Sequence, residues 1–202
     1  AGKISVIKSS IYVLILCLFA FLVLIQFNFL TIALGLASML LAFSYPFMKR
    51  ITYWPQLFLG ITFNWGVIMA WASLNNDISI EIVTLYISAI FWTLGYDTIY
   101  GAQDMSDDEI IGLKSTSIKF KKNLRLFVSS SYLVTIISIL YLFKIYMGNN
   151  LFTFLILIFV LSLVYQVFKL EKNKTKNYLK LFKYNNFSGL FLFLGICSIN
   201  LQ

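Results

Sequence analysis

The chain has 202 residues, of which 60% are hydrophobic and only 12% are charged, and its formal net charge is +8. Soluble domains average about 25% charged residues, so this composition excludes an ordinary soluble domain and predicts a membrane protein with several spans. There is no histidine, and both cysteines lie within apolar runs. These thiols suit packing positions, and nothing in their spacing indicates a zinc or haem site.

Seven segments are apolar and long enough to cross a bilayer, which takes about 20 residues in a helix. In chain order they are Ser10–Phe27, Phe29–Phe47, Leu57–Leu74, Ser79–Tyr96, Leu124–Phe143, Leu151–Phe168 and Tyr184–Leu201. The first two are separated only by Asn28, so we expect them to form an antiparallel hairpin. The runs lack the alternation of apolar and polar residues that a strand barrel requires. The expected fold is an all-α, polytopic transmembrane helical bundle in a single domain, residues 1–202.

Basic residues fall almost entirely on loops of one side of this predicted bundle, and Lys144 alone falls on the other. Lys and Arg accumulate on the cytoplasmic side of membrane proteins, so the start of the chain and the loop after the fourth span are expected to face the cytoplasm. The positive charge then follows from topology and from attraction to anionic lipid. It requires no nucleic-acid partner.

The segment Tyr96–Ser115, "YDTIYGAQDMSDDEIIGLKS", holds five of the eight acidic residues. Residues four and seven apart share a helix face, so a continuous helix would align Asp97, Asp104 and Asp108, with Asp107 beside them. Carboxylates near a membrane are costly unless a positive charge accompanies them. Oxygen ligands without histidine or thiolate indicate Mg²⁺, which binds one or two carboxylates plus substrate phosphates. The alternative is a solvated loop with acids at a helix N-terminus.

A second candidate site is "YPFMKRITYWPQ", Tyr45–Gln56, on the same predicted side of the membrane. Pro46 and Pro55 stiffen this loop. Lys49 and Arg50 offer paired cations, and the planar guanidinium group suits phosphate or carboxylate. The alternative is that these cations only set the topology.

Two further polar residues leave alternatives open. Lys114 either neutralises a phosphate or pairs with the neighbouring acids. Asn64 lies within the third predicted span, where a buried amide makes either an interhelical hydrogen bond or a substrate contact.

The acidic segment resembles the second aspartate-rich motif of the UbiA superfamily of intramembrane prenyltransferases, Y-D-x-x-Y-x-x-x-D-x-x-x-D followed by G-x-K-S. The loop "YPFMKR…PQ" and the closing "NNFSGLFLFLG" resemble one branch, the 4-hydroxybenzoate polyprenyltransferases of ubiquinone biosynthesis. The resemblance covers essentially the whole chain and implies nine helices around a central cavity. It also implies a first motif, N-D-x-x-D-x-x-x-D, which this sequence lacks. We therefore expect an N-terminally truncated chain that carries seven of nine spans.

The resemblance implies an enzyme that transfers a polyprenyl group from polyprenyl diphosphate to an aromatic ring carbon of 4-hydroxybenzoate, with Mg²⁺ as cofactor. On the matching positions, the expected metal ligands are Asp97, Asp104 and Asp108. The expected diphosphate-binding cations are Lys49, Arg50 and Lys114, and of these Arg50 and Lys114 join the three aspartates as catalytic residues. Departure of the diphosphate would leave an allylic cation that aromatic faces stabilise. The candidate cavity residues are Tyr96, Tyr100, Trp65 and Asn64.

Two alternative functions remain open. Within the family, the acceptor could be a naphthoate, homogentisate, haem or chlorophyllide precursor. From a different class, the chain could be a membrane transporter fragment, although a transporter is expected to place its acids near the bilayer midplane. The expected partners are polyprenyl diphosphate, 4-hydroxybenzoate and membrane lipid. The expected location is the bacterial inner membrane, with the active site facing the cytoplasm and the mitochondrial inner membrane as the alternative.

Overall fold

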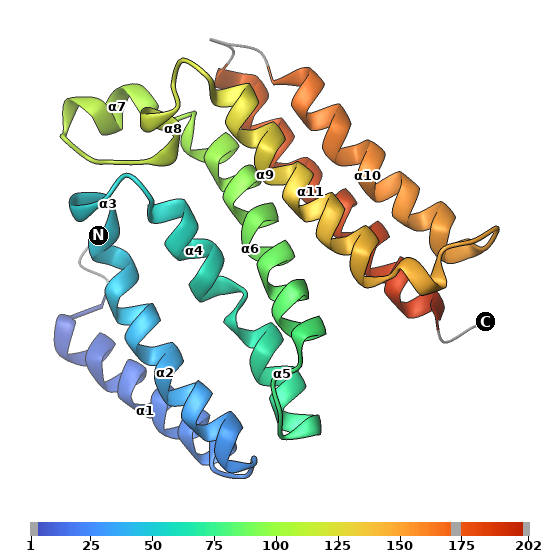
Figure 1. The fold of residues 1–202 in the computed structure, drawn as a ribbon. Helices are drawn as coiled ribbons and strands as arrows, with labels where there is room; N and C mark the ends of the chain where they lie inside the picture. Colours follow the sequence, from blue (N-terminus) through green and yellow to red (C-terminus); the bar gives the residue numbers. More distant parts are fainter. Residues whose placement is uncertain (1–3, 171–174, 200–202) are drawn as a thin grey trace.

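The computed structural model describes residues 4–170 and 175–199, and all regular structure in these ranges is helical. The elements are α1 (Val6–Leu24), α2 (Phe29–Ser44), η1 (Tyr45–Phe47), α3 (Met48–Ile51), α4 (Pro55–Phe63), α5 (Trp65–Asn75), α6 (Ile80–Gly101), α7 (Met105–Ile110), α8 (Thr116–Lys119), α9 (Leu124–Leu142), η2 (Lys144–Tyr146), α10 (Leu151–Lys169) and α11 (Thr175–Ser198). Figure 1 shows the long helices side by side, with α1 and α2 as an antiparallel hairpin. The predicted all-α bundle and its first hairpin are confirmed.

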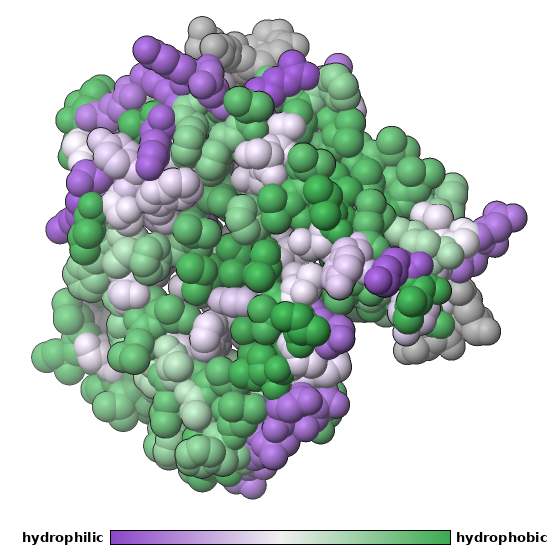
Figure 2. All heavy atoms as spheres, viewed as in Figure 1, coloured by the Kyte–Doolittle hydropathy of each residue, from purple (hydrophilic) through white to green (hydrophobic). Residues whose placement is uncertain are grey.

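Six helical segments of the described residues are long and apolar enough to cross a membrane. They are Val6–Leu24, Phe29–Ile51, Pro55–Asn75, Ile80–Gly101, Leu124–Leu142 and Leu151–Lys169, which correspond to the first six predicted spans. On the face drawn in Figure 2, hydrophobic residues cover the middle of the surface and hydrophilic residues gather toward the ends of the helices. A helical bundle with such a surface satisfies its backbone internally and suits lipid as its solvent. The chain is an integral membrane protein.

The seventh predicted span, Tyr184–Leu201, differs from this pattern. Its described residues belong to α11, which begins at Thr175, and Leu201 lies outside the described residues. The 24 residues of α11 would measure roughly 36 Å along the axis. Yet α11 is not among the segments apolar enough to span, because Lys183 and Asn185 interrupt its apolar run. It nevertheless packs along α10 and against α6 (Figure 1).

The loops that carry the basic residues lie at one end of the bundle. Figure 1 shows α3, α7 and α8 at that end, together with the start of α9 and the end of α10. Lys144, the exception in the sidedness prediction, lies in η2 at the opposite end of α9. This arrangement agrees with the predicted grouping of basic loops. Three residues of that group, Lys3, Lys172 and Lys174, lie outside the described residues.

The helix α6 lies in the middle of the bundle and packs against α4, α5, α9 and α11. Glycines bring two of these neighbours close. A Cβ added at Gly95 would overlap the ring of Tyr132 on α9, and a Cβ added at Gly60 on α4 would lie 2.9 Å from the carbonyl oxygen of Ile90. Small residues allow helix backbones to approach closely in membranes. The end of α6, where the acidic segment begins, is therefore held on two sides.

A buried polar network joins α6, α9, α10 and α11. The Oε1 atom of Gln166 accepts hydrogen bonds from Tyr132 Oη (2.8 Å) and Asn185 Nδ2 (3.0 Å), and Asn185 Oδ1 accepts one from Trp92 Nε1 (2.9 Å). The amide of Gln166 also donates to Ser188 Oγ at 3.2 Å. Polar groups in an apolar interior are costly unless they are hydrogen-bonded. The network accounts for Asn185 on α11 and Gln166 on α10, which are polar residues within otherwise apolar runs.

We expect Gly95→Ala to destabilise the bundle, because the added methyl group would overlap the ring of Tyr132, which is buried. Overpacking of this kind costs about 1–3 kcal/mol, and thermal unfolding of the detergent-solubilised protein would measure it. Gly66→Ala is the matched control, since nothing lies within 4 Å of a Cβ at that position and alanine is the better helix former. Unfolding midpoints that are equal in both variants would contradict the described packing of α6 on α9.

Candidate functional site

The acidic segment does not continue α6 as one helix. The helix α6 ends at Gly101, and α7 begins at Met105 with Asp104 at its N-cap position. Asp97 therefore belongs to α6, whereas Asp108 belongs to α7. The prediction that Asp97, Asp104 and Asp108 share one helix face is wrong, because the chain turns between the two helices.

Buried polar side chains hold this turn over the end of α6. The Oε1 atom of Gln56, on α4, accepts a hydrogen bond from the N–H of Thr116 at 2.9 Å. The hydroxyl oxygens of Thr98 and Thr116 are 2.7 Å apart, and Ser117 Oγ donates to the carbonyl of Thr98 at 2.8 Å. A Cβ at Gly101 would lie 2.8 Å from Ser117 Oγ, so the absence of a side chain lets the returning chain pass close to α6.

No pattern in the sequence indicated that these residues contact one another. Gln56 and Thr98 are polar side chains next to apolar helical runs, and a buried polar residue must find a partner. That was the available signal. It could not identify the partner, because Gln56 and Thr116 lie 60 positions apart in the chain.

The aspartates of the segment lie in different environments. Asp108 is buried, and its Oδ2 atom lies 3.5 Å from Nζ of Lys49 on α3. Asp97 is partly buried, and the charge of Lys49 acts on it as well. Asp104 and Asp107 are exposed. The cation on α3 therefore offsets negative charge from both α6 and α7.

The basic loop and the acidic segment, predicted as separate candidate sites, are in contact. The N–H of Lys114 donates to the carbonyl of Lys49 at 2.8 Å, and Nζ of Lys114 donates to the carbonyl of Ile51 at 3.2 Å. The same ammonium lies 5.6 Å from the centre of the Tyr53 ring. Lys114 thus turns toward the basic loop, and it forms no ion pair with an acid in the part of the chain that the structure describes. Arg50 is exposed in the last turn of α3.

Two of the predicted aromatic residues belong to the first part of the acidic segment. The ring centres of Tyr96 and Tyr100 are 5.8 and 4.7 Å from that of Phe182 on α11. Because both tyrosines belong to the same stretch of α6 as Asp97, the aromatic faces and this carboxylate lie at the same end of the helix. Phe182 was not among the predicted site residues.

Trp65 and Asn64 make packing contacts further along the bundle. The indole N–H of Trp65 donates to the carbonyl of Leu34 at 2.9 Å. The amide Nδ2 of Asn64 lies 2.8 Å from both the Gly60 carbonyl and Thr93 Oγ1, which joins α4 to α6. The structure thus supports the interhelical alternative for Asn64. The contacts of Trp65 likewise lie between helices and not at the acidic segment.

The donor atoms at this end of the bundle suit a hard cation. The oxygens of Asp97, Asp104 and Asp108 are the ligand type that Mg²⁺ prefers. Among the described residues, no three carboxylate, histidine or cysteine side chains lie close enough to enclose a metal by themselves. Mg²⁺ takes one or two protein carboxylates and completes its shell with water and phosphate oxygens. Asp108 already lies beside a positive charge, that of Lys49.

The chain is similar in sequence to known proteins. The model of the UbiA prenyltransferase family matches residues 1–193. The mitochondrial 4-hydroxybenzoate polyprenyltransferase of Bos taurus is 40% identical over 203 residues, which cover 100% of this chain and 54% of that protein. The 4-hydroxybenzoate octaprenyltransferase of Vibrio parahaemolyticus is 34% identical over 196 residues, which cover 97% of this chain and 69% of that protein. The chain thus spans about half the length of the mitochondrial relatives that it matches.

Two solved structures share the arrangement of the helices. The apo structure of a UbiA homolog from Aeropyrum pernix K1 superposes with a TM-score of 0.80 at 19% identity, covering 100% of this chain and 75% of that chain. A structure of digeranylgeranylglyceryl phosphate synthase gives a TM-score of 0.72 at 16% identity, covering 96% of this chain and 70% of that chain. These similarities confirm the fold, and the family match extends over nearly all of the sequence. The chain belongs to the UbiA prenyltransferase family.

Proposed function

We propose that the complete protein transfers a polyprenyl group from its diphosphate to a ring carbon of 4-hydroxybenzoate, as a step in ubiquinone biosynthesis. The observation that carries the proposal is the contact between the two loops, with Lys49 Nζ 3.5 Å from Asp108 Oδ2. It brings cations for a diphosphate and carboxylates for a metal to one end of the bundle. The family membership and the names of relatives that are 34% and 40% identical support the reaction and the acceptor.

The basic loop would bind the diphosphate. Lys49 and Arg50 are consecutive and exposed in the last turn of α3, and Lys114 is held against the same loop. The guanidinium group presents a planar fork to phosphate oxygens, and the ammonium groups act as point charges. The side chain of Lys49 is half exposed, whereas its partner Asp108 is buried, so a phosphate contact that replaced this ion pair would need the metal to offset the carboxylate charge.

Asp97, Asp104 and Asp108 are the residues that would hold Mg²⁺. When bound, the metal would stabilise the negative charge of the departing diphosphate. Two of these carboxylates are accessible to a ligand at the end of the bundle, since Asp104 is exposed and Asp97 is only partly buried, whereas Asp108 is buried.

The aromatic group formed by Tyr96, Tyr100 and Phe182 would face the reacting allylic carbon. The bond between the allylic carbon and the diphosphate oxygen breaks, and its electron pair stays with the diphosphate. The π faces of the three rings would stabilise the positive charge that develops on the allylic carbon. A ring carbon ortho to the hydroxyl of 4-hydroxybenzoate then forms the new C–C bond, and its proton leaves to water. The remainder of the polyprenyl chain is apolar and would extend along the lipid-facing helices.

The position of the acids also bears on the alternative class of function. A transporter fragment is expected to hold its coupling-ion acids near the membrane midplane. Here the acids lie near the end of α6 and on α7 or at its N-cap, at the end of the bundle where the basic loops gather (Figure 1), which supports the enzyme. The same basic loops support a site that faces the cytoplasm, and the proposed location is a bacterial inner membrane.

Membranes that contain the full-length protein are expected to prenylate 4-hydroxybenzoate from a polyprenyl diphosphate only when Mg²⁺ is present. Chromatography of the extracted lipid product would measure the reaction, with EDTA to remove the metal and added Mg²⁺ to restore it. Product formation in the presence of EDTA would contradict the assignment of Mg²⁺ as the cofactor. Transfer to a naphthoate or homogentisate acceptor, with none to 4-hydroxybenzoate, would overturn the proposed acceptor.

Asp108→Asn is expected to lower turnover by roughly 100-fold or more. Losses of this size are typical when an enzyme loses one group that stabilises the charge of a transition state. Glu109→Gln is the matched control. Glu109 is the next residue on the same short helix, but it is exposed and pairs with Lys121 at 2.6 Å, so its loss should leave turnover near that of the wild type. Gel filtration would first verify that each variant elutes at the position of the wild-type protein. Turnover rates would then be compared at equal protein amounts. Similar rates in the two variants would make Asp108 an ordinary loop charge.

A further inference from the structure

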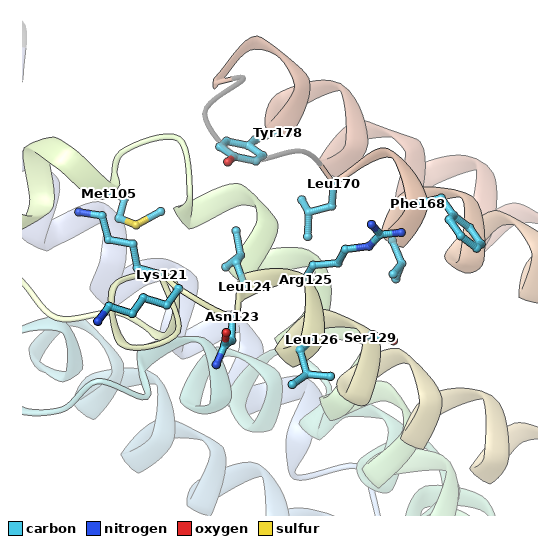
Figure 3. A pocket seen from close by; sticks show the side chains of 12 residues that line it. Met105, Lys121, Asn123, Leu124, Arg125, Leu126, Ser129, Phe168, Leu170 and Tyr178 are labelled. Atoms are coloured by element: carbon cyan, nitrogen blue, oxygen red, sulfur yellow. The ribbon is translucent and has the colours of Figure 1, made fainter.

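A hollow lies at the same end of the bundle, and none of the predicted metal-binding, diphosphate-binding or aromatic site residues lines it. It is a cavity of about 840 Å³, lined by the start of α9, the end of α10 and single residues of α7 and α11. Figure 3 shows Met105 and Phe168 on opposite sides of it, Tyr178 above, and Leu126 and Ser129 below. A volume of this size is in the range of small-molecule sites, about 300–1,000 Å³.

The wall of the cavity is basic on one part and apolar on the other. Its cations are Lys121, Lys122 and Arg125, and its apolar residues are Met105, Leu124, Leu126, Val167, Phe168 and Leu170. The guanidinium carbon of Arg125 lies 5.4 Å from the centre of the Phe168 ring, which fixes this cation between the two parts (Figure 3). Leu126 is 69% exposed and Phe168 is 68% exposed. Both belong to membrane spans, so the apolar part faces lipid.

The positive charge of the cavity is not balanced among the described residues. Lys121 pairs with Glu109, but no carboxylate in residues 4–170 and 175–199 pairs with Lys122 or Arg125. The start of α9 adds partial positive charge, because its first N–H groups have no intrahelical partner. The side chain of the N-cap residue Asn123 does not accept from them. The cavity is thus complementary to an anion.

We infer that this cavity binds the headgroup of an anionic phospholipid, with the phosphate near Lys122 and Arg125 and the first acyl carbons on the apolar wall. The cavity lies where α9 and α10 meet the membrane surface, which is the level of lipid phosphates. Basic pockets between spans on the cytoplasmic side suit anionic headgroups. A small soluble phosphate compound would leave the lipid-facing apolar wall unused.

The cavity also touches the helix that carries part of the candidate site. Met105, which lines it, is the first residue of α7 and follows Asp104 directly. The Lys121–Glu109 ion pair connects the basic wall to the same helix. A bound lipid would therefore restrain the movement of α7. Binding of the lipid does not depend on the proposed prenyl transfer.

Native mass spectrometry of the full-length protein in detergent would test the site, with dioleoylphosphatidylglycerol as the probe and dioleoylphosphatidylcholine as the neutral lipid. Phosphatidylglycerol should bind more tightly. The double variant Lys122→Gln/Arg125→Gln should lose about 25-fold in affinity for it, since each basic residue near an anionic surface contributes a factor of about five. The charge-matched control Lys8→Gln/Lys119→Gln lies outside the cavity and should keep the wild-type affinity.

Ser129→Phe gives an independent test of the apolar wall, because Ser129 lines the cavity within a membrane span and the larger side chain would occupy the cavity without a change of charge. It should also weaken phosphatidylglycerol binding, and circular dichroism would verify the helical content of each variant. Equal affinity for the two lipids would overturn the inference, as would wild-type affinity in either the double variant or Ser129→Phe. Displacement of phosphatidylglycerol by millimolar inorganic phosphate would assign the cavity to a soluble anion instead.

Discussion

The hydrogen bond from the N–H of Thr116 to Oε1 of Gln56 is the constraint on which the rest of the candidate site depends. It is 2.9 Å long, it is buried, and it joins positions 60 apart in the chain. A buried amide that loses its partner is costly, so this bond holds α8 against the start of α4. Because α8 is held there, Lys114 and Ser115, which directly precede it, lie beside the basic loop. The N–H of Lys114 then donates to the carbonyl of Lys49. Lys49 in turn reaches Asp108.

The electrostatics of the two loops then form one arrangement. Acids gathered at a membrane surface repel one another, and here the ammonium group of Lys49 on α3 lies beside Asp108 and offsets part of that repulsion. The ammonium group of Lys114 is held against the carbonyl of Ile51 in the basic loop. The same loops would exchange these internal contacts for those of a diphosphate and its metal. The aromatic contact between α6 and α11 lies next to them. Charged chemistry at the membrane surface and apolar chemistry along the helices therefore meet at one end of the bundle.

Apolar length and basic-residue bias were sufficient to predict six spans, the first hairpin and the shared side of the two loops, because these depend on local composition. Helix periodicity failed at the acidic segment, since it assumes that α6 continues past Gly101, whereas contacts with Gln56 and Ser117 turn the chain there. The polar residues of α11 were unexplained without their partners on α6 and α10. Which aromatic residues approach the acidic segment also depends on distant packing, which is why the contacts of Phe182 with Tyr96 and Tyr100 were not predicted.

Amide hydrogen exchange across residues 114–118 tests most directly whether Gln56 holds the acidic segment in place. The measurement would compare the full-length wild-type protein with Gln56→Ala. We predict slow exchange at the Lys114 and Thr116 amides of the wild type and exchange at least about tenfold faster in the variant, because the loss of this buried hydrogen bond frees the segment to open locally. Exchange in α9 should be the same in both proteins. Equal exchange rates at Lys114 and Thr116 in the two proteins would contradict the account.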